Sequence, residues 1–96
     1  MKQFYVYMLC NKRNGTLYLG MTNDLVRRIS EHRQEITDGF SKKYKTHRLV
    51  WYEVHDNPEA AIQREKQIKK WERAWKTREI EKQNPYWKDL AEDLNG

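Results

Sequence analysis

Two apolar runs near the start of the chain predict a β-hairpin. Residues 4–10 form a continuous apolar and aromatic segment, and a second strand-like segment follows at residues 16–20. The polar residues between the runs include Asn14-Gly15, a pair that tolerates positive φ and favours tight turns. A longer loop starting at Asn11 is equally allowed, so the pattern predicts the hairpin but leaves its register open.

Either register places Tyr7 and Tyr18 on one face of the hairpin. A turn centred on Asn14-Gly15 pairs Asn11 with Tyr18, whereas a longer symmetric loop pairs Tyr7 with Tyr18. The two registers differ by an even number of residues, and side chains alternate between faces along a strand. Two tyrosines on one strand face are by themselves more typical of packing than of catalysis.

The following segment predicts a helix over residues 24–33. Thr22 or Asn23 can cap it, and an acidic residue in its first turn suits the helix dipole. Arg28 and His32 border its apolar stripe and stand four residues apart. Because residues four apart are neighbours on a helix, both side chains can point into one cleft.

The remainder of the chain predicts a third strand and further helical segments. In order, these are a loop at 34–48 with a short helical turn at 40–44, a strand at 49–54, a helix at 58–71, a helix at 77–82 and a short turn at 84–90. Asn57 and Pro58 provide an N-cap and a first-turn proline for the helix at 58–71.

One carboxylate stands out on the predicted helix at 58–71. The apolar stripe of this helix consists of Ala61, Ile68, Trp71 and Trp75. Glu65 shares that stripe, and burying an unpaired carboxylate is costly. An ion pair with Arg64 or Lys69 explains its place, and so does a position at the edge of a cleft facing a metal ion.

Composition indicates a single packed domain spanning residues 1–96. The 96 residues are 38% hydrophobic and 12% aromatic, which favours a small dense core despite a mean hydropathy of -1.15. We expect Trp71, Trp75 and Trp87 to belong to that core. The only cysteine, Cys10, excludes an intrachain disulfide or CxxC zinc site. With no apolar run near the ~20 residues that span a bilayer, we expect no membrane association and a cytoplasmic location.

Positive charge is concentrated in the first half of the chain. Residues 1–50 contain ten Lys or Arg against four Asp or Glu, whereas residues 51–96 contain nine against ten. A basic surface attracts a polyanion and loses affinity as salt rises, although many basic proteins merely have solvated surfaces. The candidate nucleic-acid contacts are Lys12, Arg13, Arg27, Lys42, Lys43 and Lys45.

Taken together, these residues resemble the GIY-YIG nuclease family. The resemblance rests on Tyr5-Val6-Tyr7, Tyr18-Leu19-Gly20, Thr22, Leu25, Arg28, His32, Glu65 and Asn84, in that order and spacing. The chain is similar in particular to small stand-alone YhbQ-like bacterial proteins, through Ile68-Lys69-Lys70-Trp71 and Asn84-Pro85-Tyr86-Trp87. The family name spells the residues Gly-Ile-Tyr and Tyr-Ile-Gly. This chain instead has Tyr5 for Gly, Val6 for Ile and Leu19 for Ile. The resemblance implies an α+β fold, with a three-stranded antiparallel sheet flanked by helices.

The resemblance also implies roles for six residues. Glu65 would bind Mg²⁺ or Mn²⁺, and Arg28 would stabilise charge on the phosphate in the transition state. Tyr7 would act as general base, with Tyr18 orienting water or phosphate and His32 helping to move the proton. A phenol has a reference pKa of about 10, so His32 competes with Tyr7 as the base. Asn84 would brace the site or contact phosphate, but it can equally be a helix cap.

The function predicted from this resemblance is a magnesium-dependent endonuclease that hydrolyses DNA. Branched or damaged structures, as in DNA repair, are the expected substrates because no sequence-reading module is evident. A nucleic-acid-binding module that does not cut, or that cuts only with a partner protein, is the alternative. RNA also stays open as a ligand, since nothing in the sequence recognisably reads a 2′-hydroxyl.

Overall fold

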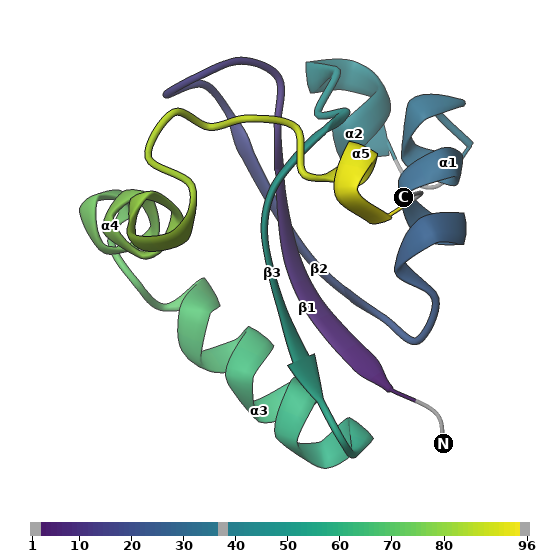
Figure 1. Ribbon diagram of the computed structural model, residues 1–96, viewed down its shortest axis with the longest axis vertical. Helices are drawn as coiled ribbons and strands as arrows, with labels where there is room; N and C mark the ends of the chain where they lie inside the picture. The colour runs from purple at the N-terminus through teal and green to yellow at the C-terminus, as the bar shows by residue number, and fades with distance from the viewer. Residues whose placement is uncertain (1–2, 37–38, 95–96) are drawn as a thin grey trace.

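A computed structural model describes residues 3–36 and 39–94 as a three-stranded antiparallel sheet with helices on both faces (Figure 1). The strands are β1 (Phe4–Cys10), β2 (Leu17–Thr22) and β3 (Arg48–His55), in the order β2-β1-β3. The central strand β1 is therefore paired on both sides. The predicted α+β fold with a three-stranded antiparallel sheet is confirmed.

The hairpin register lies between the two predicted ones. Tyr7 pairs with Gly20, and Leu9 pairs with Tyr18. The connecting loop is held by the Asn11 side chain, which accepts a hydrogen bond from the Thr16 backbone N–H at 2.9 Å. The observed register differs by two residues from each prediction, so Tyr7 and Tyr18 still share a face.

In the described part of the chain, five helices lie against the sheet. They are α1 (Leu25–Arg33), α2 (Gly39–Tyr44), α3 (Pro58–Lys69), α4 (Arg73–Gln83) and α5 (Ala91–Leu94). Figure 1 shows α3 and α4 on one side of the sheet and α1, α2 and α5 on the other. None of the described helices has the length and apolar composition needed to cross a membrane. Residues 37 and 38 of the predicted loop lie outside the described part.

The two faces of β1 bury different residues. Val6, Met8 and Cys10 belong to a core cluster with residues of α3 and α4. Tyr7 and Leu9 belong to a second cluster, together with residues of α1 and α5. All five side chains are fully buried, as expected for a central strand covered on both faces.

The cap of α1 corrects a prediction. Asp24, rather than Thr22 or Asn23, is the N-cap residue, and its carboxylate accepts a hydrogen bond from the Arg27 backbone N–H at 3.1 Å. The Thr22 hydroxyl accepts instead from the Asp24 backbone N–H, also at 3.1 Å. An aspartate at this position satisfies a free amide of the first turn directly.

The predicted stripe through Trp75 is also wrong. The helix at 58–71 ends at Lys69, and the next one starts at Arg73 rather than at residue 77. This break changes the helical phase, so Trp71 is half-buried and Trp75 is 54% exposed. Trp87 is fully buried and confirms its predicted place in the core.

The last helical turn comes later than residues 84–90. Trp87 has φ of 57°, a left-handed conformation that ends helical continuation at this point. The Asp89 carboxylate accepts a hydrogen bond from the Ala91 backbone N–H at 3.0 Å, at the start of α5. The side chain that bonds to the start of the final turn is thus that of Asp89, just before α5, rather than that of Asn84.

Candidate active site

Tyr7 and His32 meet inside the protein, beneath α1. The Tyr7 hydroxyl lies 3.0 Å from His32 Nε2, and both side chains are fully buried. Tyr7 comes from the central strand, whereas His32 follows the buried Ile29 by three residues on the inner face of α1. A phenol and an imidazole at this distance can pass a proton between them, with donor and acceptor set by the histidine tautomer.

Tyr18 completes an aromatic cluster with these two residues. Its ring centroid lies 4.8 Å from that of His32 and 6.2 Å from that of Tyr7. Tyr18 is only half-buried, since it lies on the edge strand β2. The Tyr7–Tyr18–His32 cluster therefore extends from the protein interior to the molecular surface.

Gly20 makes room for this cluster, a role that sequence reasoning missed. A Cβ atom at position 20 would lie 2.6 Å from both Cζ and the hydroxyl oxygen of Tyr7, and 2.9 Å from Cε1 of Tyr18. Those distances are far below van der Waals contact. The tyrosine rings therefore require glycine here, and only the pairing of Tyr7 with Gly20 could have indicated this beforehand.

Arg28 lies on α1, one turn before His32, and is held by a neighbouring carboxylate. Its Nε is 3.2 Å from Glu31 Oε1, and both side chains are about one-third exposed (33% and 32%). This Nε is itself buried and forms no well-directed hydrogen bond with any described residue. The Arg28 side chain as a whole is still partly exposed, so an incoming acceptor can reach the guanidinium beside Glu31. Glu31 is a second residue that the sequence analysis missed.

Glu65 projects from α3, the helix on the other side of the sheet from α1. Its side chain is 22% exposed and its Oε1 lies 3.5 Å from Lys69 Nζ, one helical turn away. The ion pair considered with Lys69 is therefore present. The described residues contain no group of three or more His, Cys, Asp and Glu side chains that could hold a metal ion.

A single carboxylate of this kind suits one class of metal ion. Mg²⁺ commonly keeps several waters and binds through one or two carboxylates together with substrate phosphates. Glu65 is accessible, and its present partner is an exposed lysine whose attraction in water is weak. The donor set is compatible with a divalent ion completed by water and phosphate, and not with a closed structural site.

Asn84 has contacts of a different kind. Its side-chain amide donates to the backbone carbonyls of Val50 at 3.1 Å and Lys88 at 2.8 Å. Its side-chain oxygen accepts from the Lys88 backbone N–H at 2.9 Å. The residue is 4% exposed and joins the end of α4 to β3, so these contacts brace the fold.

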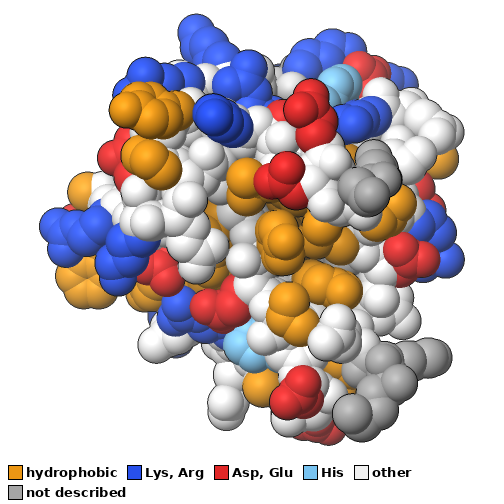
Figure 2. All heavy atoms as spheres, in the orientation of Figure 1, with side chains coloured by type: hydrophobic (Ala, Val, Ile, Leu, Met, Phe, Trp, Pro, Cys, Tyr) orange, Lys and Arg blue, Asp and Glu red, His pale blue; other side chains and the backbone are white. Residues whose placement is uncertain are grey.

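The predicted nucleic-acid contacts belong to three separate segments. Lys12 and Arg13 lie in the β1–β2 loop, and Lys42 and Lys43 in the last turn of α2. Figure 2 shows Lys and Arg side chains gathered at the end of the molecule where Figure 1 places this loop and α2.

Two of these basic residues are paired with carboxylates. Lys45 Nζ lies 2.6 Å from Glu35 Oε1, and this lysine holds the pKa of Glu35 below its ordinary value. Arg27 on α1 lies 4.0 Å from Asp24. Lys45 and Arg27 are therefore less available for phosphate than the cations of the β1–β2 loop and α2.

Comparison with known proteins relates this geometry to a family. A model of the GIY-YIG catalytic domain matches residues 3–79. A UPF0213 protein of Syntrophus aciditrophicus is 38% identical over 87 residues, covering 88% of this chain and 97% of that protein. A UPF0213 protein of Streptococcus pyogenes serotype M5 is 39% identical over 73 residues, covering 72% and 74%. The NMR structure of a Bacillus halodurans UPF0213 protein is 29% identical with a TM-score of 0.49, covering 79% and 80%.

Proposed function

Because this chain belongs to the GIY-YIG catalytic-domain family, we propose that it is an endonuclease that hydrolyses DNA phosphodiester bonds with the help of a divalent metal ion. The observation that carries the proposal is the buried hydrogen bond between Tyr7 and His32, which extends to the surface through Tyr18. Two fully buried polar side chains that connect to the edge strand β2 through Tyr18 suit proton transfer better than packing alone.

The Tyr7–His32 pair takes the proton of the attacking water. As the water oxygen bonds to phosphorus, the bond from phosphorus to the leaving sugar oxygen breaks, and that oxygen takes a proton from solvent. The proton of the attacking water passes to the Tyr7 oxygen, and the Tyr7 proton passes to His32 Nε2 over 3.0 Å. The imidazole ends as its cation, and the phenol is regenerated. In this arrangement the half-buried Tyr18 side chain moves aside so that water reaches the Tyr7 hydroxyl, which is buried in the free protein, and His32 stores the proton. The two candidate bases thus act as a pair.

Arg28 neutralises charge on the phosphate. Its guanidinium carries five donors, and the side chain is 33% exposed beside Glu31. Charge-assisted bonds from arginine to phosphate are short and strong, and they matter most where negative charge increases in the transition state. In the absence of phosphate, the ion pair with Glu31 holds the Arg28 guanidinium in its position on α1.

Glu65 is the residue that would hold the metal ion, Mg²⁺ or Mn²⁺. When bound, such an ion would supply positive charge to the phosphate oxygens and the leaving oxygen. Glu65 would give up its contact with Lys69 at small cost, because the lysine side chain is 59% exposed. Asn84 acts at a distance by holding the end of α4 against β3.

The substrate we propose is DNA of irregular structure, such as branched or damaged duplex. Lysines at the basic end of the molecule contact backbone phosphates as flexible point charges and do not distinguish bases. Selection would therefore depend on the shape of the substrate. Binding without cleavage is an alternative that the cleavage assay separates, and adding labelled RNA as a substrate separates the RNA alternative.

The test is cleavage of labelled duplex, single-stranded and branched DNA by purified protein with and without Mg²⁺. Glu65→Gln preserves side-chain shape and should lower metal-dependent cleavage on the order of a thousandfold. Glu59→Gln, a carboxylate in the first turn of the same helix, is the matched control and should cleave like wild type.

Two outcomes would contradict the proposal. Cleavage that persists in Glu65→Gln would point to a contaminating nuclease or to a different metal ligand. DNA binding without any metal-dependent cleavage by the wild-type protein would instead support the binding-module alternative. In that case Arg28→Ala should weaken binding more than Glu65→Gln.

A further inference from the structure

Two tryptophans meet at the surface between α3 and α4. The ring centroids of Trp71 and Trp75 lie 6.2 Å apart, with the ring planes at 65°. Trp71 is half-buried, whereas Trp75 is 54% exposed. Trp75 is therefore one of the large apolar side chains that stay exposed, and a second tryptophan supports its ring.

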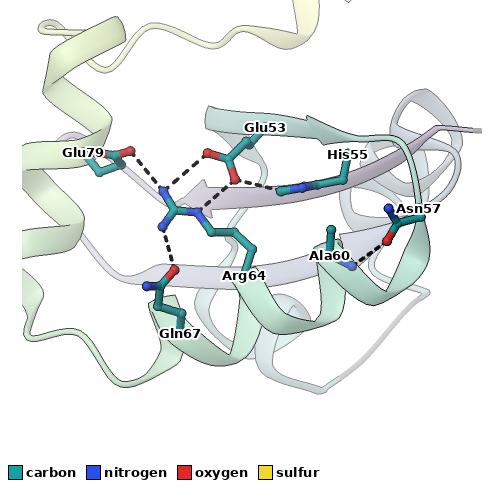
Figure 3. A network of polar contacts seen from close by, with 7 residues as sticks. All are labelled: Glu53, His55, Asn57, Ala60, Arg64, Gln67 and Glu79. Atoms are coloured by element: carbon teal, nitrogen blue, oxygen red, sulfur yellow. Dashed lines mark hydrogen bonds and ion pairs between the residues drawn. The ribbon is translucent and has the colours of Figure 1, made fainter.

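Arg64 packs on Trp71, and its guanidinium is hydrogen-bonded to two carboxylates. Arg64 lies over the Trp71 ring, with 5.1 Å between Cζ and the ring centroid. Figure 3 shows the Arg64 guanidinium between Glu53 of β3 and Glu79 of α4, with hydrogen-bond lengths of 2.9 Å and 3.3 Å to their carboxylates. The position of Trp71 is thus determined by three elements of the fold. A rigid aromatic surface loses little entropy when a ligand stacks on it.

Basic grooves lie on both sides of Trp71. One groove, of about 720 Å³, is lined by Lys66 and Lys70 of the α3 end, and a smaller one of about 180 Å³ by Arg78 and Trp75 of α4. Lys66, Lys70 and Arg78 are exposed and form no ion pair with any carboxylate of residues 3–36 and 39–94. The tryptophan surface is therefore bordered by positive charges that remain available to an anion.

We propose that this Trp71–Trp75 surface binds single-stranded nucleic acid, with unpaired bases stacking on Trp75 and phosphates contacting Lys70 and Arg78. Sites for single strands combine aromatic platforms with a positively charged groove, since every base has a face that can stack. A base inside a duplex has its faces covered by its neighbours, so only unpaired nucleotides fit.

This inference rests on the proposed nuclease function and gives it a substrate preference. The surface begins at the C-terminal end of α3, the helix that carries Glu65. Trp71 lies just beyond Lys69, where α3 ends, and Lys69 is about 6 Å from Glu65 along the helix axis. A strand held at the Trp71–Trp75 surface would lie on the side of the sheet that carries Glu65, the proposed metal ligand, which favours DNA with an unpaired segment.

The test is binding of a labelled short oligothymidylate, measured by fluorescence anisotropy in EDTA so that no cleavage occurs. Trp75→Ala should weaken binding about tenfold. Trp75→Phe should retain most of the affinity, because it keeps a stacking ring. Tyr86→Ala is the matched control, since Tyr86 is 69% exposed and lies outside both grooves. An oligomer of the same length without bases should bind wild type and Trp75→Ala equally.

Equal oligothymidylate binding by wild type and Trp75→Ala would overturn the inference. An equal loss of affinity for the oligomer without bases would do so too, because the tryptophan would then act through the fold or the backbone. Both results leave the proposed function intact if Glu65→Gln still abolishes metal-dependent cleavage. Loss of that cleavage difference alone would reject the nuclease and retain the single-strand site.

Discussion

The two faces of β1 show how one strand can support both the core and the candidate active site. On the face toward α3 and α4, Val6, Met8 and Cys10 pack in an apolar cluster. On the face toward α1, the Tyr7 hydroxyl is hydrogen-bonded to His32 in an equally buried position. Burial is the same on both faces, and only the chemistry differs. Stability and activity should therefore respond separately to changes at alternate residues.

Met8→Ala should have the largest effect on stability and little effect on activity. Met8 is fully buried in the apolar cluster, and removing a side chain of this size from a core costs about 2–5 kcal/mol of the free energy of unfolding. Urea titration measures this loss. Cleavage per folded molecule, assayed well below the unfolding midpoint, should stay close to wild type. A large fall in specific activity would show that the two faces are not independent.

Gly20→Ala should lower both the free energy of unfolding and the cleavage activity, in contrast to Met8→Ala. The new Cβ would lie 2.6 Å from the Tyr7 hydroxyl, and overpacking of this kind costs about 1–3 kcal/mol. Displacing Tyr7 should also reduce cleavage, by about a hundredfold for a shift near 1 Å.

The matched control for Gly20→Ala is Gly39→Ala in α2. A Cβ atom at position 39 meets nothing within 4 Å, so this change should preserve stability and activity. Wild-type cleavage by Gly20→Ala would mean that the position of the Tyr7 ring does not matter for the chemistry.

The smallest expected effect is the pH dependence of stability that comes from the Cys10 thiol. Burial raises the pKa of its thiol from an ordinary value of 9.0 to about 11, although the nearby Arg48 opposes the shift. Between pH 9 and pH 11 the unfolded chain loses this proton while the native protein keeps it, so stability falls as pH rises through that window. Below about pH 9 the thiol is protonated in both the native and the unfolded state, so it adds no pH dependence to the free energy of unfolding.

The measurement is the stability difference between wild type and Cys10→Ala at several pH values. The difference should be constant up to about pH 9 and then shrink, because only the wild type loses stability through this thiol. Other groups that titrate at high pH are common to both proteins and cancel. A difference that stays constant to pH 11 would show that the thiol ionises equally in both states.

Local signals in the sequence account for most of the fold that was predicted. The hairpin, α1 and β3 each show their own periodicity, and Asn57 caps α3 as its position before Pro58 indicates. The shared face of Tyr7 and Tyr18 was predictable without the register, because all the competing registers differ by even shifts.

Features that depend on tertiary geometry escaped prediction. The break after Lys69 has no glycine or proline to mark it, so the exposure of Trp75 could not be anticipated. Glu31 contacts Arg28 through a particular pair of side-chain conformations. Gly20 matters only in the register that places it opposite Tyr7, and the Asn11 side chain in the loop helps to set that register.

The β1–β2 loop is a place where the chain can change in length without altering the faces of the two strands. A one-residue insertion within β1 would exchange its two faces and place the Tyr7 hydroxyl in the apolar core. An insertion in residues 11–16 leaves the alternation of both strands unchanged, and exposed loops accept added length at low cost. This loop also carries Lys12 and Arg13, so its length and charge can change without altering the shared face of Tyr7 and Tyr18.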